Sequence, residues 1–199
     1  MDFKMHEYTH AVVGKVVPAL RATDRADMND SRRQYDYYLR LLKELNLELI
    51  EIETDAFFPE NIVLEDLAIV CHGIVLMPRP ISATEEIIVA KGVRHLKRYF
   101  SMAGPDILCV ASSKEAQEML KRIEREATFT YQTLTVPENG AANCLYVNGT
   151  LIHRAIEEIP ESFKVFCEKI DFARRSICFS GLAKVSTGLT ACCLLVRKL

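Results

Sequence analysis

The sequence predicts an α+β fold made of repeated strand–turn–strand–helix units arranged around an axis. Short apolar and β-branched runs alternate with stretches of helical period, and turn signals lie between neighbouring strands. A second observation is a weak internal repeat, because the runs 67–77 and 144–153 both look like hairpins that lead into a basic residue, an acidic stretch and a helical pattern. No GxGxxG or P-loop motif supports a doubly wound nucleotide-binding sheet.

Composition favours one folded domain spanning 1–199. The chain has 25 basic and 27 acidic side chains, a net charge of −2 and 49% hydrophobic residues, which is too apolar and too weakly charged for a disordered chain. A pI near 6.2 argues against a nucleic-acid or anionic-membrane partner bound through bulk charge. No apolar run reaches the roughly 18 residues of a membrane-spanning helix, and the polar start MDFKMHEY does not resemble a signal peptide.

The first half of the chain is predicted to hold, in order, a strand at 10–17, a helix at 29–46, a strand at 47–52, a strand at 66–71 and the hairpin 67–77. The helix is predicted because apolar residues recur along one face, at Tyr35, Tyr38, Leu39, Leu42 and Leu45. Asp30 or Ser31 is expected to cap it. The hairpin is expected to turn at His72-Gly73 and to end before Pro80.

The second half is predicted to hold a strand at 106–111, a helix to about Arg125, a strand at 130–136, the hairpin 144–153, a helix at 160–170, and strands at 175–179 and 189–196. Ser112 and Glu115 have the spacing of a capping box. Asn148-Gly149 is the strongest hairpin signal, because both residues tolerate the positive φ that a tight turn needs.

The seven cysteines indicate reduced thiols in a cytoplasmic protein. They lie singly in apolar runs, except for the pair Cys192-Cys193. No CxxC occurs, so we expect no metal site.

Cys192-Cys193, in the run LTACCLLV, is the first candidate for chemistry. The simpler interpretation is two core cysteines on a buried strand. On a strand, adjacent side chains point to opposite faces, so at most one of the two thiols faces a given cavity. A thiolate nucleophile also needs a base or a cation beside it.

His95 and the carboxylates Glu65 and Asp66 are the other candidates. His95 lies among Arg94, Lys97 and Arg98, so it is either part of a solvated basic face or a general acid and base paired in space with a cysteine. Glu65-Asp66 precedes an apolar strand and is either a polar loop end or a pair that binds a planar guanidinium cation.

Six runs, in order, resemble the dimethylarginine dimethylaminohydrolase family of pentein-type guanidine hydrolases: THAVV (9–13), VLEDLAIV (63–70), HLKRYFSMAGPDIL (95–108), LTVPENGAANCLYVN (134–148), IPESFKVF (159–166) and GLTACCLLV (188–196). The resemblance implies a pentein-type propeller of ββαβ modules around a central active site. It also implies an amidine hydrolase that converts N-methylated L-arginine to L-citrulline and a methylamine through a cysteine thiouronium. A place in arginine catabolism and nitric-oxide regulation follows from the same resemblance, with no cofactor and a small molecule as the partner.

The resemblance also implies roles for particular residues. The nucleophile is Cys192 and the general acid and base is His95. The substrate is held by the carboxylates Glu65, Asp66 and Glu60, and by loop backbone at Leu20 and Ser186.

The junction at about 81–94 is where this chain departs from the family. The resemblance places about one full module between Arg79-Pro80 and His95, whereas this chain has the 14 residues ISATEEIIVAKGVR. We therefore expect an incomplete propeller of about four modules. An alternative to the enzyme is a non-catalytic relative that binds or regulates. A third reading is a shortened version of a longer enzyme. The sequence does not predict an oligomeric state.

Overall fold

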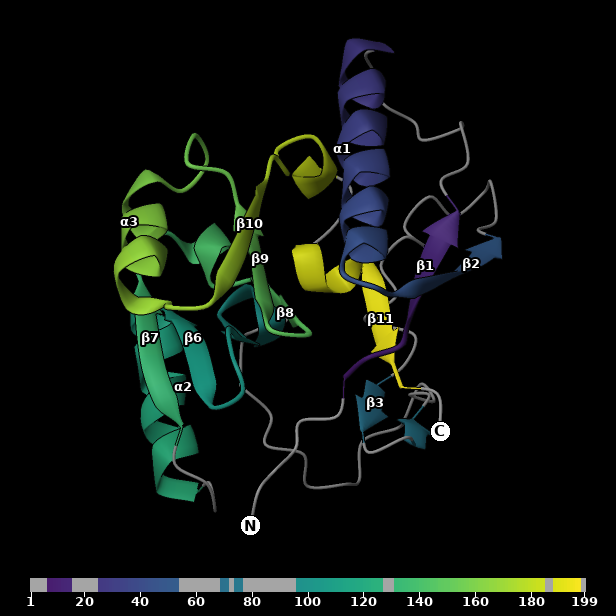
Figure 1. The fold of residues 1–199 in the computed structure, drawn as a ribbon. Coiled ribbons are helices and arrows are strands. Elements are labelled where there is room, and N and C mark those ends of the chain that lie inside the picture. The colour runs from purple at the N-terminus through teal and green to yellow at the C-terminus, as the bar shows by residue number, and fades with distance from the viewer. Residues whose placement is uncertain are drawn as a thin grey trace, which may run out of the picture.

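The computed structural model describes residues 7–15, 25–53, 69–71, 74–76, 96–126, 131–184 and 188–197. Within these residues the chain forms four small β-sheets with helices α1, α2 and α3 packed beside them (Figure 1). The α+β class and the repeated units predicted from the sequence are confirmed.

One complete ββαβ unit consists of β5 (Phe100–Met102), β6 (Ile107–Ala111), α2 (Lys114–Glu126) and β7 (Gln132–Val136). Strand β6 pairs antiparallel with β5 and parallel with β7. A 3-10 turn, η3 (Leu96–Arg98), precedes this unit. The short strand β5 is not predicted from the sequence, because three residues carry too little periodicity to distinguish a strand.

The next unit repeats the same topology with β8 (Leu145–Val147), β9 (Thr150–Arg154), α3 (Pro160–Lys169) and β10 (Ala173–Ile177). Strand β9 is antiparallel to β8 and parallel to β10. The turn between β8 and β9 has φ values of 45° at Asn148 and 84° at Gly149, as the Asn-Gly signal predicts.

The third unit joins the two ends of the chain: β11 (Cys193–Val196) pairs antiparallel with β1 (His10–Lys15), which is followed by α1 (Arg25–Glu44) and the parallel strand β2 (Glu48–Glu53). The hairpin β3 (Ile69–Cys71) and β4 (Ile74–Leu76) forms the fourth sheet. The described residues therefore form three complete units and one hairpin. The proposed turn at His72-Gly73 lies outside them.

Several predicted boundaries are wrong, for local reasons. Helix α1 begins at Arg25, so Asp30 and Ser31 lie inside it and not at its N-cap position. The stretch 25–34 is mostly charged or polar, so no apolar face marks the start of the helix. Helix α2 is capped by Ser113, whose hydroxyl accepts the Ala116 N–H at 3.3 Å, and not by Ser112. Strand β10 lies two residues earlier than predicted, because an exposed edge strand can be as polar as ARRSI.

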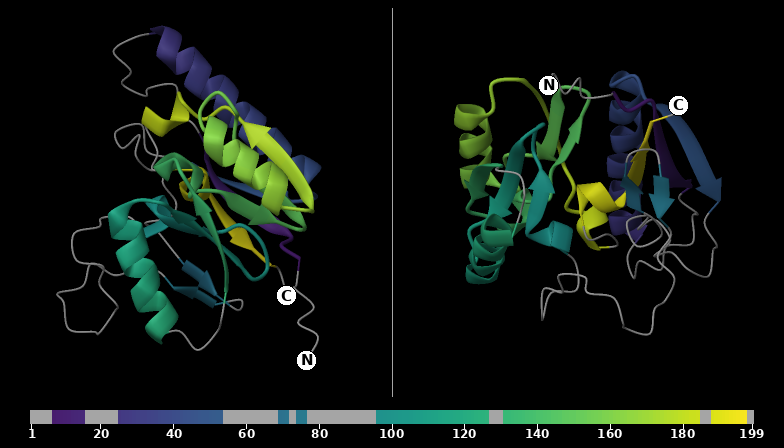
Figure 2. Two further views of the ribbon diagram at one scale, coloured as in Figure 1. Left: turned by 90° about the vertical axis from the view of Figure 1, so that its left-hand side faces the viewer. Right: turned by 90° about the horizontal axis from the view of Figure 1, so that it is seen from below.

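Two apolar clusters hold the units together. In the first, α1 packs against the sheet of β1 and β11 and against the second unit, with the fully buried Tyr35, Tyr38, Leu42 and Phe179 among its members. In the second, α2 and α3 cover β6, β7 and β9. Helices α2 and α3 lie on the side of the molecule remote from β11 (Figures 1 and 2).

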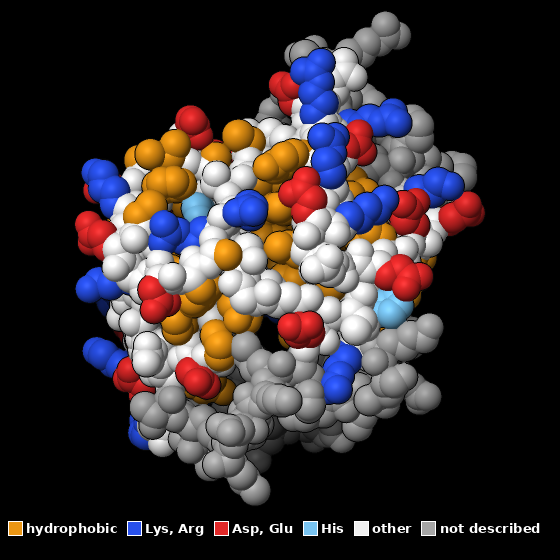
Figure 3. Space-filling model, in the orientation of Figure 1, with side chains coloured by type: hydrophobic (Ala, Val, Ile, Leu, Met, Phe, Trp, Pro, Cys, Tyr) orange, Lys and Arg blue, Asp and Glu red, His pale blue; other side chains and the backbone are white. Residues whose placement is uncertain are grey.

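The charged surface is mixed. On the face drawn in Figure 3, acidic and basic side chains are interspersed, with no single-sign patch among the residues shown in colour. In the described parts of the chain, no helix is long and apolar enough to cross a membrane.

Helix α3 is capped from a distant loop. Its own N-cap residue, Ile159, offers no side-chain hydrogen bond. Instead the Glu138 carboxylate accepts the backbone N–H groups of Glu161 (2.9 Å) and Ser162 (2.8 Å) and also the Ser162 hydroxyl. Burial alone would raise the pKa of Glu138, but these hydrogen bonds, led by that from Ser162, hold the pKa below its ordinary value.

We expect Glu138→Gln to destabilise the fold by about 1 kcal/mol at neutral pH, because the charged cap of α3 becomes neutral. The pKa of Glu138 is lower in the folded chain than in the unfolded chain, so its charge stabilises the fold at pH values above the unfolded-state pKa. That stabilisation is lost as the pH falls through the folded-state pKa. The difference between wild type and variant in urea unfolding should therefore close on acidification below about pH 4.3. The exposed Glu157→Gln serves as the charge-matched control; an equal effect there would contradict the capping role.

The Tyr38 hydroxyl links α1 to the last segment of the chain by donating to the Leu189 carbonyl (3.0 Å) and toward the Cys193 thiol (3.1 Å). We expect Tyr38→Phe to lower the free energy of unfolding by about 1 kcal/mol, since both contacts are buried. The neighbouring Tyr37, 43% exposed, is the matched control, and Tyr37→Phe should change stability by less than about 0.5 kcal/mol in the same urea titration. Equal losses in the two variants would refute the link.

Candidate active site around Cys192

Cys192 lies in the turn between η6 (Leu189–Ala191) and β11. Its backbone is helical, with φ −83° and ψ −8°, and its N–H donates to the Leu189 carbonyl at 3.4 Å. The thiol is fully buried and donates to the Gly188 carbonyl at 3.6 Å. The predicted strand over 189–196 is therefore wrong in its first half. An apolar run such as LTACC does not distinguish a buried turn from a buried strand by its pattern.

The neighbouring Cys193 begins β11 and lies opposite Val13 of β1. Burial raises the pKa of the Cys193 thiol to about 11, although the Tyr38 hydroxyl and the Lys97 charge act in the opposite direction. At neutral pH Cys193 is therefore a protonated core thiol. Both cysteines of the pair are buried, as the simpler interpretation of two core cysteines expects. Because Cys192 precedes β11, the argument from alternation along a strand does not apply to the pair.

Asn143 ties the turn of Cys192 to the segment that follows His95. It is 3% exposed. Its Nδ2 donates to the Lys97 carbonyl and to the Thr190 hydroxyl, both at 2.9 Å, and its Oδ1 accepts the Thr190 N–H at 3.0 Å. Gly188 packs directly on this amide group, and a Cβ at position 188 would collide with it. Sequence reasoning missed Asn143; the signal was a polar residue inside the apolar run AANCLYV.

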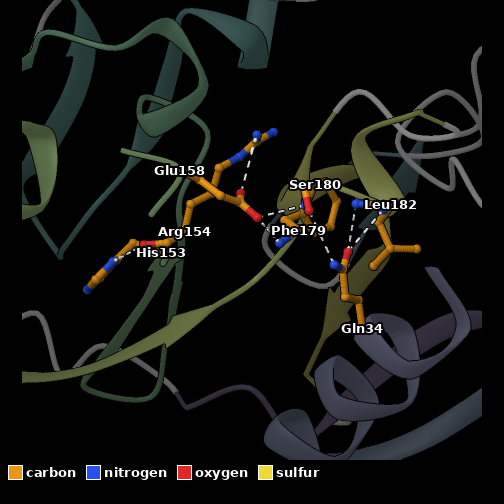
Figure 4. A network of polar contacts seen from close by, with 8 residues as sticks. Gln34, His153, Arg154, Glu158, Phe179, Ser180 and Leu182 are labelled. Carbon is orange, nitrogen blue, oxygen red and sulfur yellow. Dashed lines mark hydrogen bonds and ion pairs between the residues drawn. The ribbon is translucent and has the colours of Figure 1, made fainter. Parts of the chain in front are cut away.

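The turn 179–182, which leads toward Gly188, is held from two sides (Figure 4). Glu158 reaches it from the second unit and Gln34 from α1. Four consecutive backbone N–H groups donate to these side chains: Phe179 (2.6 Å) and Ser180 (2.8 Å) to Glu158, and Gly181 (2.9 Å) and Leu182 (3.2 Å) to Gln34. Glu158 also faces the half-buried Arg154 at 3.7 Å, and the Arg154 guanidinium lies 5.1 Å from the centre of the Phe179 ring. The start of the segment that carries Cys192 is thus fixed before it reaches η6.

Of the predicted site residues, the structure describes Cys192 alone. The proposed general acid His95 and the proposed substrate-binding residues lie outside the described residues: Glu65, Asp66, Glu60, Leu20 and Ser186. Their positions relative to Cys192 therefore stay predictions. Two of these residues lie close in sequence to described ones. Leu96, the first residue of η3, directly follows His95, and Gly188 lies two residues after Ser186.

Among the described residues, no three His, Cys, Asp or Glu side chains gather in a way that could hold a metal ion. A pocket of about 370 Å³ lies at the β8–β9 turn, lined by Glu7, Tyr8, Glu44 and Asn148 among others, and does not include Cys192. The buried turn at Cys192 is therefore the described feature that best matches the sequence-based site.

Curated proteins and solved structures show similarity to this chain, whereas protein-family models do not. No protein-family model matches the chain. It is 28% identical over 116 residues to human DDAH2, a hydrolase by name, and 28% identical over 109 residues to the bovine protein of the same name. These matches cover 55% and 51% of this chain but 41% and 38% of the relatives, so the chain matches about two fifths of their length.

Solved structures share the fold. The dimethylarginine dimethylaminohydrolase (DDAH) of Pseudomonas aeruginosa, a cysteine-to-serine mutant complexed with citrulline, superposes with a TM-score of 0.61 at 15% identity, covering 96% of this chain and 100% of that one. The N-terminal domain of ArgZ, a cyanobacterial arginine dihydrolase bound to product, gives a TM-score of 0.67 at 11% identity and covers 96% of this chain and 98% of that domain. The pentein-type ββαβ fold expected from the sequence is thereby confirmed.

We expect alkylation with a neutral reagent such as iodoacetamide at pH 7 to reach the exposed Cys167 and Cys178 and to leave Cys193 unlabelled. A raised pKa keeps Cys193 protonated until the pH approaches about 11. Peptide mapping by mass spectrometry measures the labelled fraction at each position. Labelling of Cys193 as fast as Cys167 in a folded sample would contradict the buried, protonated thiol.

Proposed function

We propose that this chain, a DDAH-like protein with the pentein fold and a resemblance to amidine hydrolases, hydrolyses N-methylated L-arginine to L-citrulline and a methylamine. The observation that carries the proposal is the placement of Cys192. It lies in a buried turn where the last strand returns to the first, in a fold whose solved members include enzymes of arginine and methylarginine. Fold alone does not establish activity, so the argument rests on the site residues.

The proposed reaction begins with attack of the Cys192 thiolate on the guanidinium carbon. Asp66 and Glu65 hold the planar cation and balance its charge, and Glu60 adds a further carboxylate. Collapse of the adduct breaks the bond to the methylated nitrogen. His95 donates a proton to the departing amine and leaves a covalent thiouronium on sulfur.

The second half-reaction releases the product. His95, now neutral, takes a proton from water, and the resulting hydroxide adds to the thiouronium carbon. Collapse breaks the C–S bond and restores the Cys192 thiolate, while His95 keeps the proton that it took from water. The hydroxyl proton of the adduct passes to solvent, where the departed amine takes it up, and citrulline is free. Leu20 and Ser186 are proposed to line the substrate through their backbone. A cytoplasmic location and a link to nitric-oxide regulation belong to the same proposal.

A second candidate function, binding without turnover, is favoured by two observations. The Cys192 thiol has no exposed surface. The junction 81–94 is also too short to hold the module in which the resemblance places a carboxylate that orients the histidine and an arginine that clamps the substrate carboxylate. Loss of an orienting carboxylate costs on the order of 10⁴ in kcat in a serine-protease triad. After such a loss the chain would still bind methylated arginine but would turn it over slowly or not at all.

Citrulline release from asymmetric dimethylarginine tests the proposal. We expect Cys192→Ser to lower the rate by at least about 10³-fold, because the weaker hydroxyl nucleophile cannot replace the thiolate. The adjacent Cys193→Ser is the matched control and should keep turnover within about tenfold, since Cys193 is a protonated core thiol.

Equal citrulline release from wild type and Cys192→Ser would refute the proposed nucleophile. A folded wild-type chain that releases no citrulline, yet binds asymmetric dimethylarginine in isothermal titration calorimetry, would favour the binding module.

A further inference from the structure

The Asn143 side chain sits between two segments that are far apart in sequence. Lys97 lies 46 residues before it and Thr190 lies 47 residues after it. One amide group bonds both: Nδ2 uses its two hydrogens on the Lys97 carbonyl and the Thr190 hydroxyl, and Oδ1 accepts the Thr190 N–H. Such a group fixes the distance between its partners, because hydrogen bonds to a planar amide are short and directional.

The two bonded segments are those that carry the proposed reacting groups. Lys97 is two residues after His95, and Thr190 is two residues before Cys192. The contact continues to Cys192 through Gly188, which packs on the Asn143 amide and accepts the Cys192 thiol at 3.6 Å. At 3% exposure of Asn143 and 8% of Thr190, solvent offers no ready replacement for these bonds.

We infer that Asn143 is a positioning residue, which sets the spacing between η3, directly after His95 in sequence, and the turn that carries Cys192. The inference rests on the proposed function for the roles of His95 and Cys192, but the bridge itself is a property of the described residues. Asn143 touches neither substrate nor the reacting atoms in this scheme. It acts by holding Thr190 and Lys97.

The substitution Asn143→Asp tests the inference with almost no change in volume. A carboxylate cannot donate, so both Nδ2 hydrogen bonds are lost and an anionic oxygen faces the Lys97 carbonyl. We expect kcat for citrulline release to fall by about 10²-fold with KM changed by less than about threefold, since a displacement near 1 Å of a reacting group costs that much in rate. The rate at which an electrophilic amidine such as 2-chloroacetamidine alkylates Cys192, with loss of chloride, should fall by about tenfold or more.

Asn148 offers a closely matched control. Its Oδ1 also accepts a backbone N–H, from Tyr8 at 2.8 Å, and its Nδ2 also donates to a backbone carbonyl, that of Tyr8, at 2.9 Å. It does so at the β8–β9 turn, where it bridges segments that carry no proposed reacting group. Asn148→Asp should therefore lose some stability in a thermal melt, less than Asn143→Asp because its bonds are exposed, but keep kcat and the Cys192 alkylation rate within about twofold of wild type.

The outcomes separate this inference from the proposed function. If wild type turns over and both variants lose kcat equally, Asn143 is merely structural and the inference is overturned, while the proposed function stands. If wild type does not turn over, the proposed function fails and the Cys192 alkylation rate alone decides: a selective loss in Asn143→Asp supports the bridge, and an unchanged rate overturns it.

A second pair of variants covers the case in which Asn143→Asp does not fold. Thr190→Val removes the hydroxyl that Asn143 bonds and keeps the side-chain shape, whereas Thr190→Ser keeps the hydroxyl. We expect Cys192 alkylation to slow several-fold in Thr190→Val and to stay near wild type in Thr190→Ser. Equal rates in the two would overturn the inference.

Discussion

The pairing of β11 with β1 is the constraint on which the rest of this structure depends. It runs antiparallel from His10 opposite Val196 to Val13 opposite Cys193. Without β11 the sheet of the third unit would consist of β1 and β2 alone, and α1 would lose part of the surface on which Tyr35 and Tyr38 pack. The same pairing holds η6 at the start of β11, on the side that faces the second unit (Figure 1). Cys192 is thus placed by a contact between the first and last strands of the chain.

Buried and partly buried polar side chains then decide how neighbouring units meet. Asn143, Glu138, Glu158 and Gln34 come from different elements, yet each bonds backbone N–H groups of a segment distant in sequence. Buried backbone groups need such partners, and an unmet one costs about 1–3 kcal/mol. Apolar packing tolerates small shifts between units, whereas these directional bonds do not. The polar contacts therefore set the register of the units, and the apolar clusters supply most of the cohesion.

The sequence predicted those parts of the fold that local patterns determine. The apolar face of α1 is visible in the spacing of Tyr35, Tyr38 and Leu42, all of which are buried. The Asn148-Gly149 turn follows from the positive φ that these residues accept. By contrast, η6 is invisible to periodicity, because it is stabilised by Tyr38 and Asn143 from elsewhere in the chain. Because tertiary contacts stabilise this 3-10 turn, its sequence shows only an apolar run, which has the same pattern as a buried strand.

The same division applies to the candidate site. The pair Cys192-Cys193 stood out in the sequence, and the resemblance supplied the choice of Cys192 as nucleophile and the roles of the remaining residues. Asn143 was missed because its importance comes from two partners nearly 50 residues away on either side, which no local spacing encodes. The resemblance chose Cys192 over Cys193, and the structure adds a physical difference, since burial raises the pKa of Cys193 to about 11 and keeps it a protonated core thiol.

The pairing of β11 with β1 has a consequence for the order in which parts of the molecule fold during synthesis. The units 100–136 and 145–177 are contiguous in sequence, so each can assemble from local contacts as synthesis proceeds from the N-terminus. The sheet of the third unit cannot assemble in this way, because about 180 residues must be synthesised after β1 before its partner β11 exists. At roughly 5–20 residues per second, that wait is on the order of ten seconds or more. During synthesis the apolar face of α1 therefore stays uncovered by β11 throughout this interval, and the turn that carries Cys192 cannot take its place beside β1 until its end.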